Sequence, residues 1–331
     1  MGSTLIERLR SRGDEVTCIA KDRLNLPVLE ALGVRVALGD LNQANGWDDA
    51  LAGVECVYHL AGVTRAQSSR EYYEGNHLAT RRLLELCLRH GPRLQRFLYV
   101  SSLAAVGPAF HGQPVDETTP YHPVSHYGRS KMRGEMEVLQ VRDRLPITIV
   151  RPSAVYGPRE RDMYEYIKLI AHGIQPLIGF RRKLLNLVHS ADLVEGILLA
   201  AASPRAIGET YFLGSAESYT TEEIGEAVAN VVHSHPLRIH VPHLMVYGIG
   251  ALAQAAGAAL HRQVFFNLQK ARESVQPAWT CSVQKARSHL GFQPRLSLNE
   301  GMRITYRWYL ENGWLNSSGQ PWPAGGATRP A

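Results

Sequence analysis

The stretch RFLYVSS, at residues 96–102, is an apolar and aromatic run that ends in two serines. Similar short runs, rich in β-branched side chains, recur at 15–20, 34–40, 54–60, 146–150 and 209–213, and segments with helical spacing separate them. Regular alternation of short strands with helices is typical of a parallel sheet that is covered on both faces. The sequence therefore predicts an α/β fold with a doubly wound parallel sheet.

Polar residues or glycines directly follow four of these runs. They are Asp40, the segment 59–62 (HLAG), the pair Ser101 and Ser102, and Arg151 with Pro152. In open α/β sheets, ligands bind beyond the carboxyl ends of the strands. We therefore expect these residues to lie together at one edge of the sheet and to form a ligand site there.

A tyrosine and a lysine open the helix that is expected from about residue 127 to residue 142. Tyr127 and Lys131 are four residues apart and so lie on one helical face. A phenol with a pKa near 10 is a poor acid or base at neutral pH, but an ammonium group beside it favours the phenolate, and a serine hydroxyl can hold a substrate oxygen. The pair predicts proton transfer in carbonyl or alcohol chemistry; a surface helix with a chance Tyr and Lys is the alternative.

The composition is that of an ordinary globular protein, since 45% of the 331 residues are hydrophobic and 20% are charged. The formal net charge is +6, without a long basic run. The tightest basic cluster, RRK at 181–183, is either a solvated loop or a contact for an anionic cofactor or substrate, and nucleic acid is not an expected partner. Four scattered cysteines without a C-x-x-C pair indicate a reducing compartment, so a cytoplasmic protein is expected.

The longest apolar run, at 244–260, is short for a membrane span and is rich in alanine and glycine. It predicts a packed helix, with contact to a membrane surface as the alternative. A group of histidines lacks the carboxylate or cysteine that would complete a ligand set, so no metal site is predicted there. These histidines are His233, His235, His240 and His243.

Ordered motifs along the chain carry a resemblance to a known family. They are GDL at 39–41, HLAG at 59–62, Asn76, VSS at 100–102, YGRSK at 127–131, RP at 151–152, VYGP at 155–158, LGFQP at 290–294 and EG at 300–301. With these motifs the chain resembles, over essentially its whole length, the extended short-chain dehydrogenase/reductase superfamily, in its NAD-dependent epimerase/dehydratase group. The resemblance implies a Rossmann-type sheet followed by a smaller, mostly helical substrate domain.

The same resemblance implies a division into domains. Residues 1–160 would form the dinucleotide-binding domain, to which 185–214 would return. The segments 161–184 and 215–316 would form the substrate domain. The tail at 317–331, rich in Pro, Gly and Ser, is expected to be disordered.

The resemblance also implies roles for single residues. Tyr127 would be the catalytic acid/base, and Lys131 would lower its pKa and bind the nicotinamide ribose. Ser102 would polarise the substrate oxygen, and Asn76 would support a proton-relay water. Further cofactor contacts would come from Gly2, Lys21, Asp40, Leu41, Leu60, Ala61, Gly62, Ser101, Arg151 and Pro152. The implied partner is a small-molecule substrate, and a homodimer through the Asn76 and Tyr127 helices is a possibility.

The front of the chain departs from the family pattern. The family opens with a strand and a glycine-rich turn whose N–H groups meet the cofactor pyrophosphate. This chain begins with MGSTL, which resembles the end of that motif with Gly2 as its last glycine. We expect that the start is placed too late in the reading frame and that the natural protein is longer. The alternative is a truncated, non-catalytic cofactor-binding or sensor protein.

Cofactor and substrate can also be argued from the resemblance. Ala20 occupies the position of the acidic residue of NAD-specific members and Lys21 follows, which favours NADP, although Asp22 leaves NAD open. The segment 178–183 (IGFRRK) lacks the Gly-Asp-Gly-type turn of nucleotide-sugar epimerases. With the apolar run at 244–260, this favours a hydroxysteroid dehydrogenase or dihydroflavonol reductase-like oxidoreductase. A nucleotide-sugar epimerase or dehydratase is the alternative, with Arg159, Arg181 and Arg182 available for phosphates.

Overall fold

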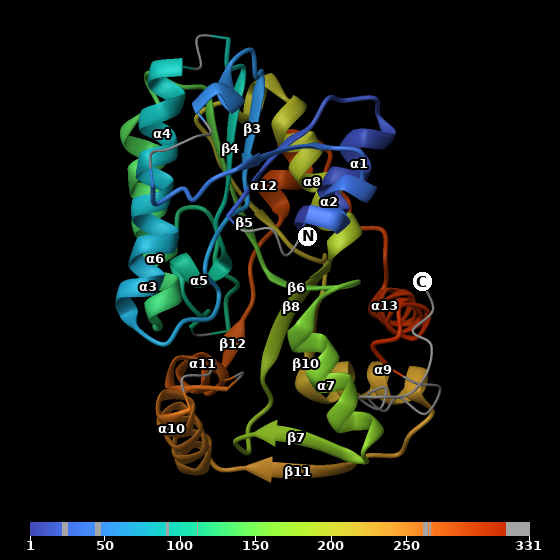
Figure 1. Ribbon diagram of the computed structural model, residues 1–331. Helices are drawn as coiled ribbons and strands as arrows, with labels where there is room; N and C mark the ends of the chain where they lie inside the picture. The colour runs from blue at the N-terminus through green and yellow to red at the C-terminus, as the bar shows by residue number, and fades with distance from the viewer. Residues whose placement is uncertain are drawn as a thin grey trace.

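The computed structural model describes residues 1–21, 26–43, 48–90, 93–110, 112–260, 264 and 266–315 (Figure 1). Its main sheet consists of parallel strands in the order β3 (Cys56–His59), β4 (Arg96–Val100), β5 (Ile147–Pro152) and β9 (Thr210–Leu213). A second parallel pair is formed by β1 (Thr17–Ala20) and β2 (Arg35–Leu38). The predicted α/β fold with a doubly wound parallel sheet is confirmed.

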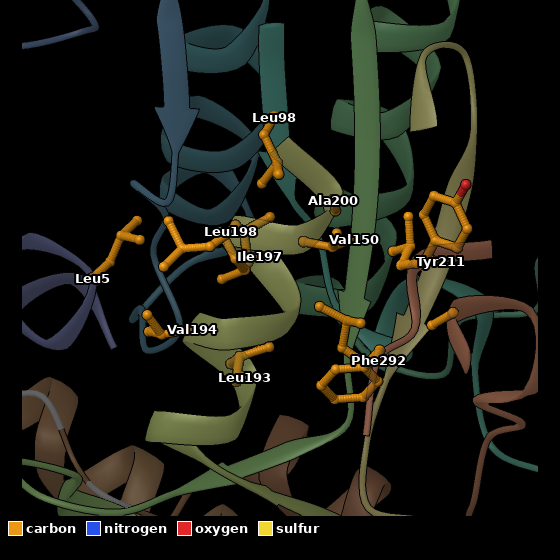
Figure 2. Close-up of a cluster of buried hydrophobic side chains, with 14 of the residues drawn as sticks. Leu5, Leu98, Val150, Leu193, Val194, Ile197, Leu198, Ala200, Tyr211 and Phe292 are labelled. Carbon is orange, nitrogen blue, oxygen red and sulfur yellow. The ribbon is translucent and has the colours of Figure 1, made fainter. Parts of the chain in front are cut away.

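Helices cover both faces of the main sheet because successive strand residues point to opposite sides. Phe97 and Tyr99 pack against α4 (Ala79–His90) and α6 (His126–Gln140). Leu98 and Val150 face the other side, where Figure 2 shows them near Ile197 and Ala200 of α8 (Ser190–Ala202). That face is completed by α1 (Gly2–Ser11) and α12 (Gln284–Leu290). Each such fully buried side chain stabilises the fold by about 1.5–3 kcal/mol.

The two parallel sheets share their helices but are not joined by hydrogen bonds among the described residues. Val16 and Tyr58 pack on the α8 side, and Ile19 and Val57 pack on the α4 side. Each of β1 and β3 therefore has one hydrogen-bonding edge without a strand partner in the described part of the chain. Both strands are only half-buried, whereas every residue of β4 and β5 is buried.

The remaining strands lie below the carboxyl edge of the main sheet (Figure 1). In one small sheet, β8 (Leu184–His189) pairs with β6 (Ala154–Tyr156), β10 (Ser218–Thr220) and β12 (Ala278–Trp279). The other small sheet consists of β7 (Ile174–Ile178) and β11 (Leu237–Val241). None of these strands is among the regular runs of the sequence, because most are short or carry no regular alternation.

Helices complete this lower part. They are α7 (Arg161–Ala171), α9 (Thr221–Val232), α10 (His243–Ala259), α11 (Leu268–Ser274) and α13 (Leu298–Glu311). Helix α9 begins at a capping box, in which Thr220 and Glu223 bond each other's backbone N–H groups. The apolar run at 244–260 forms a helix, α10, as expected, but most of its residues are exposed, so the prediction that this helix is packed is wrong. No helix in the described ranges has both the length and the apolarity to cross a bilayer.

Four further helical elements and two turns connect the layers. They are α2 (Leu26–Ala31), α3 (Ser69–Tyr73), α5 (Leu103–Val106), the π-helical turn η2 (Glu74–Leu78) and the 3-10 turns at Asp48–Leu51 and Pro204–Ala206. The helix predicted from Asn76 to His90 therefore begins earlier, at Ser69, because Ser68 and Glu71 form a capping box. The tail at 317–331 lies outside the described residues.

Candidate active site

Tyr127 lies in the first turn of α6, at the carboxyl edge of the main sheet. The helix begins after Ser125, whose Oγ accepts a hydrogen bond from the Gly128 N–H at 3.0 Å. Gly128 lets α6 approach α5 closely, since a Cβ there would lie 2.3 Å from the Ala104 carbonyl oxygen. This approach places Tyr127 close enough to Ser102 for the serine hydroxyl to lower the pKa of the phenol, and Ser102 itself caps α5 by accepting a bond from the Ala104 N–H. The structure thus brings together the two hydroxyls that the sequence singled out.

The surroundings of Tyr127 keep its phenol protonated. Burial raises the pKa of Tyr127 to about 12, the hydrogen bond with Ser102 opposes this rise, and Glu273 adds to it. At neutral pH the phenol is therefore a proton donor, as reduction of a carbonyl requires.

Lys131 lies one turn further along α6 and is buried. Its Nζ donates a hydrogen bond to the Val100 carbonyl at 2.6 Å and lies 4.5 Å from the centre of the Tyr99 ring. Burial lowers the pKa of Lys131 to about 8, against the attraction of Glu135. The resemblance implied that Lys131 lowers the pKa of Tyr127. In the structure burial raises that pKa instead, and the Lys131 ammonium group is hydrogen-bonded to a backbone carbonyl.

Asn76 fixes the loop after β3 to α6. It is fully buried in the π-helical turn η2, a feature that is frequent at functional sites. Its Oδ1 accepts a bond from the Val63 N–H at 2.6 Å, and its Nδ2 donates to the Val63 carbonyl at 2.9 Å and to Ser130 Oγ at 2.8 Å. Gly62 is pressed against this amide, because a Cβ there would lie 2.9 Å from Oδ1. The HLAG loop is thereby held beside Lys131.

Arg151 at the end of β5 braces α6 from behind. Its guanidinium bonds the Glu135 carboxylate at 2.7 Å and the Tyr121 hydroxyl at 2.9 Å, and that hydroxyl donates to Glu135 at 2.6 Å. Arg151 and Glu135 are 4% and 0% exposed. Most of the guanidinium that the resemblance assigned to the cofactor is thus bonded to Glu135 and Tyr121, whereas its buried Nη1 has no hydrogen-bond partner among the described residues. Glu135 was missed, although it continues the four-residue spacing of Tyr127 and Lys131.

A second group of polar atoms lies where α1 begins. His189 Nε2 and Ser190 Oγ are buried and have no hydrogen-bond partner among the described residues. Gly157, with φ of 140°, faces them, since a Cβ there would lie 2.4 Å from Ser190 Oγ and 3.2 Å from His189 Nε2. Burial lowers the pKa of His189 to about 4, and the nearby Met1 amine acts in the same direction. Neutral donors therefore surround the positive end of α1, which no described side chain caps.

Asp40 and Lys21 form a third group, beyond β2 and β1. The Asp40 carboxylate accepts a bond from the Asn42 N–H at 2.9 Å and lies 3.0 Å from Lys21 Nζ. Burial tends to raise the pKa of Asp40, but these two partners lower it on balance. Lys21 is exposed, and β1 ends at Ala20 as expected. Asp22 lies outside the described residues.

The other predicted cofactor residues line the same edge. Ser101 is buried at the end of β4, and its Oγ has no hydrogen-bond partner in the part of the chain that the structure describes. Leu41 and Leu60 pack on opposite faces of the sheet, and Ala61 is exposed. Gly2 is exposed, and a Cβ there would meet nothing within 4 Å; Pro152 pairs with Leu213 of β9.

Helix α11 holds the start of α6 from the side opposite the sheet. Glu273 accepts a bond from Ser125 Oγ at 2.6 Å, and Gln269 Oε1 accepts one from the His126 N–H at 2.9 Å. Nearby, Asp162 pairs with Lys270 at 2.9 Å and with Arg65. The sequence analysis missed α11, because these residues belong to no motif and reach Tyr127 only through the tertiary fold.

The close approach of α5 and α6 leads to a first prediction. Replacing Gly128 with alanine is expected to cost about 1–3 kcal/mol, because the added methyl group must push α6 away from the Ala104 carbonyl. It should also lower kcat by separating Tyr127 from Ser102. Urea unfolding and steady-state kinetics measure both effects. Gly248→Ala, at a helical glycine of α10 with free space, is the control, and an equal effect of both changes would contradict the packing argument.

Comparison with known proteins agrees with this arrangement. The model of the NAD dependent epimerase/dehydratase family matches residues 1–214. The ceramide reductase of Caulobacter vibrioides is 28% identical over 323 residues, which cover 95% of this chain and 93% of that protein. Sterol demethylase protein B of Methylococcus capsulatus is 28% identical over 330 residues, covering 95% of this chain and 97% of that protein.

A solved structure with bound ligands is similar over nearly the whole chain. MoeE5 in complex with UDP-glucose and NAD is 26% identical, has a TM-score of 0.74, and covers 93% of this chain and 94% of that one. The overall fold is thus similar to that of a protein solved with a nucleotide sugar and NAD.

Proposed function

The chain belongs to the NAD dependent epimerase/dehydratase family, and on that premise we propose that it is a reductase of an apolar, lipid-like carbonyl compound. The observation that carries the proposal is the protonated Tyr127 phenol in contact with Ser102, with the Lys131 ammonium one turn away. Hydride transfer to a carbonyl carbon leaves charge on the oxygen, and a phenol beside it can deliver the required proton.

A nicotinamide dinucleotide fits the carboxyl edge at three places. The first place is beside Tyr127, where the HLAG loop lies next to Lys131. Its glycine, Gly62, has no room for a Cβ, which would collide with Asn76. At the uncapped start of α1, His189 Nε2 and Ser190 Oγ, which have no hydrogen-bond partner in the described part of the chain, offer donors to a phosphate group. Beyond β1 and β2, Asp40 and Lys21 offer polar groups to the adenosine end.

The chain's own residues would act as follows. The bound nicotinamide supplies the hydride for the carbonyl carbon. Ser102 hydrogen-bonds the substrate oxygen and orients it, and Tyr127 donates its phenolic proton to that oxygen. Lys131, on the same face of α6, stabilises the phenolate that remains until a proton returns. Asn76 holds the loop and the helix in register through Val63 and Ser130.

The charges near Tyr127 favour an apolar substrate over a nucleotide sugar. Arg65 and Lys270 are both paired with Asp162, and Glu273 also attracts Lys270, so these two cations and two carboxylates together carry no net charge. Arg159, which the alternative would use for phosphates, donates to Ser3 and Glu7 of α1 at 3.0 and 2.9 Å. The two relatives above are named for ceramide and sterol chemistry, which supports the same substrate class.

Nucleotide-sugar chemistry is the second candidate, and the similarity to MoeE5 with UDP-glucose and NAD favours it. A parallel assay separates the two. The protein is incubated with NADPH or NADH and a 3-keto lipid, and separately with NAD and UDP-glucose. Cofactor oxidation with the keto lipid supports the reductase; conversion of UDP-glucose without net cofactor change supports the epimerase. Binding of cofactor without turnover of any substrate would support the sensor alternative.

We further propose that the preferred cofactor is NADP, because Ala20 occupies the position at the end of β1 where NAD-specific enzymes have a carboxylate, and Lys21 follows it. Replacing Lys21 with alanine is expected to raise the KM for NADPH about tenfold, as one charge-assisted bond to a 2′-phosphate is worth about 1.5–3 kcal/mol. The KM for NADH should change little. Initial-rate kinetics with both cofactors test this, and an equal change in the two constants would sink the assignment. Arg35→Ala, an exposed basic residue of β2, is the control.

A further inference from the structure

Helix α10 is apolar on almost every side and yet mostly exposed. Its 17 residues, His243–Ala259, include no Asp, Glu, Lys or Arg. Only Val246, Gly250 and Gly257 are buried, and they lie on one stripe of the helix. Gly250 packs on α11, since a Cβ added to it would lie 3.2 Å from the Cβ of Ala271. A helix without charged residues is normally covered on all sides. The remaining faces of α10 therefore call for a partner.

Large apolar side chains point away from that stripe. Leu244 is 84% exposed, Leu252 74%, Met245 57% and Ile249 49%. Phe180, in the turn between β7 and β8, is 73% exposed and stacks on His240 with ring centres 5.5 Å apart. We call these five residues the apolar surface. Exposed contiguous apolar side chains of this kind mark protein or membrane interaction sites.

The two parts of the apolar surface are neighbours. Gly179 lies against His243 at the start of α10, since a Cβ on Gly179 would be 2.6 Å from the His243 ring. The turn that carries Phe180 therefore adjoins the first turn of α10, and in Figure 1 the ends of β7 and β11 both point toward this helix.

Basic side chains lie beside the Phe180 end of the apolar surface. Arg181 and Arg182 directly follow Phe180 in the chain and are exposed, although Arg182 also lies within range of Glu223. An apolar centre with an arginine border matches the acyl chains and phosphates of an anionic membrane.

We propose that the apolar surface docks on an anionic membrane, with its leucines and Phe180 among the acyl chains and the bordering arginines at the lipid phosphates. A second copy of the chain fits less well, because a two-fold interface would set this basic border against itself. The docking does not depend on the reaction that the protein catalyses.

Docking would also bring a lipid substrate close to Tyr127, an extension that rests on the proposed function. Helix α10 packs on α11, and α11 holds the first turn of α6 through Glu273 and Gln269. An apolar molecule leaving the bilayer at α10 would therefore meet the element that borders the reactive phenol.

Vesicle flotation of the full chain tests the docking. The protein is mixed with phosphatidylcholine vesicles that contain or lack phosphatidylglycerol. It should float with the anionic vesicles and much less with the neutral ones. Leu244→Glu/Leu252→Glu should lose flotation at least tenfold, and Arg181→Glu/Arg182→Glu about fivefold or more for each charge. Ile207→Glu, at an exposed apolar residue of the turn before β9, is the matched control and should float like the parent protein.

Two further measurements separate the outcomes. Each variant is assayed with a short, water-soluble keto substrate, whose turnover the surface variants should leave unchanged. Absence of that turnover in the parent protein would argue against the proposed reductase and not against the docking. Flotation that is equal in all variants, or that is absent in the parent, would overturn the docking. A parent dimer in solution that Leu252→Glu separates, without flotation, would assign the surface to a second copy instead.

Discussion

Tyr127→Phe is expected to lower kcat for carbonyl reduction about a thousandfold, because general acid catalysis contributes roughly 10²–10⁴. The substitution removes only the hydroxyl that contacts Ser102, so the ring and its packing in α6 are kept. Cofactor affinity, measured by fluorescence titration, should change little, since the proton and not the binding is lost. Steady-state kinetics with a keto lipid gives the ratio directly.

Tyr72→Phe is the matched control for this prediction. The Tyr72 ring lies 6.3 Å from that of Tyr127, and its hydroxyl reaches the Thr64 carbonyl only at 3.5 Å. The Tyr72→Phe variant therefore lacks a neighbouring hydroxyl group but keeps the proposed proton donor, Tyr127. A Tyr127→Phe enzyme that retains kcat within a few-fold would refute the role of Tyr127, whatever the control does.

Glu135→Gln is expected to lower the free energy of unfolding by about 3–5 kcal/mol, because it leaves the charge of Arg151 buried without its partner. Arg151 is 4% exposed and Glu135 is 0% exposed, so water cannot replace the lost carboxylate. Urea denaturation measures the change. The exposed pair of Glu226 with Arg238 supplies the comparison, since Glu226→Gln should cost no more than about 1 kcal/mol.

A double variant separates the pair from its unpaired charge. Arg151→Met/Glu135→Leu replaces both buried charges by apolar groups of similar volume and should recover most of the lost stability. If the double variant is as unstable as Glu135→Gln, the loss comes from packing behind α6 and not from the isolated guanidinium.

Local patterns carried the prediction of the fold. Short β-branched runs and helical spacing placed β4 at its observed bounds and placed α9 at its capping box. The residues after each strand then collect at one edge, because parallel strands share the direction of their carboxyl ends. Tyr127 and Ser102 meet for that reason, and the contact itself depends on Gly128, whose role follows from helix packing that no single motif encodes.

Contacts between distant segments could not be read from the sequence. Glu273 and Gln269 reach α6 from positions 148 and 143 residues away in the chain. Arg151 belongs to a motif that implied cofactor binding, but its guanidinium donates hydrogen bonds to Glu135. The pKa of Tyr127 is set by burial, a quantity of the folded chain, and so it moved opposite to the direction that Lys131 alone suggests.

Isotope transfer tests the central claim most directly. The protein is supplied with NADPH that carries deuterium at the transferable position of the nicotinamide and with a 3-keto lipid, and the product is analysed by mass spectrometry. The account predicts an alcohol with a single deuterium on the former carbonyl carbon and an equal amount of oxidised cofactor. An alcohol without deuterium, or turnover of a nucleotide sugar with no net cofactor oxidation while the keto lipid stays unchanged, would contradict it.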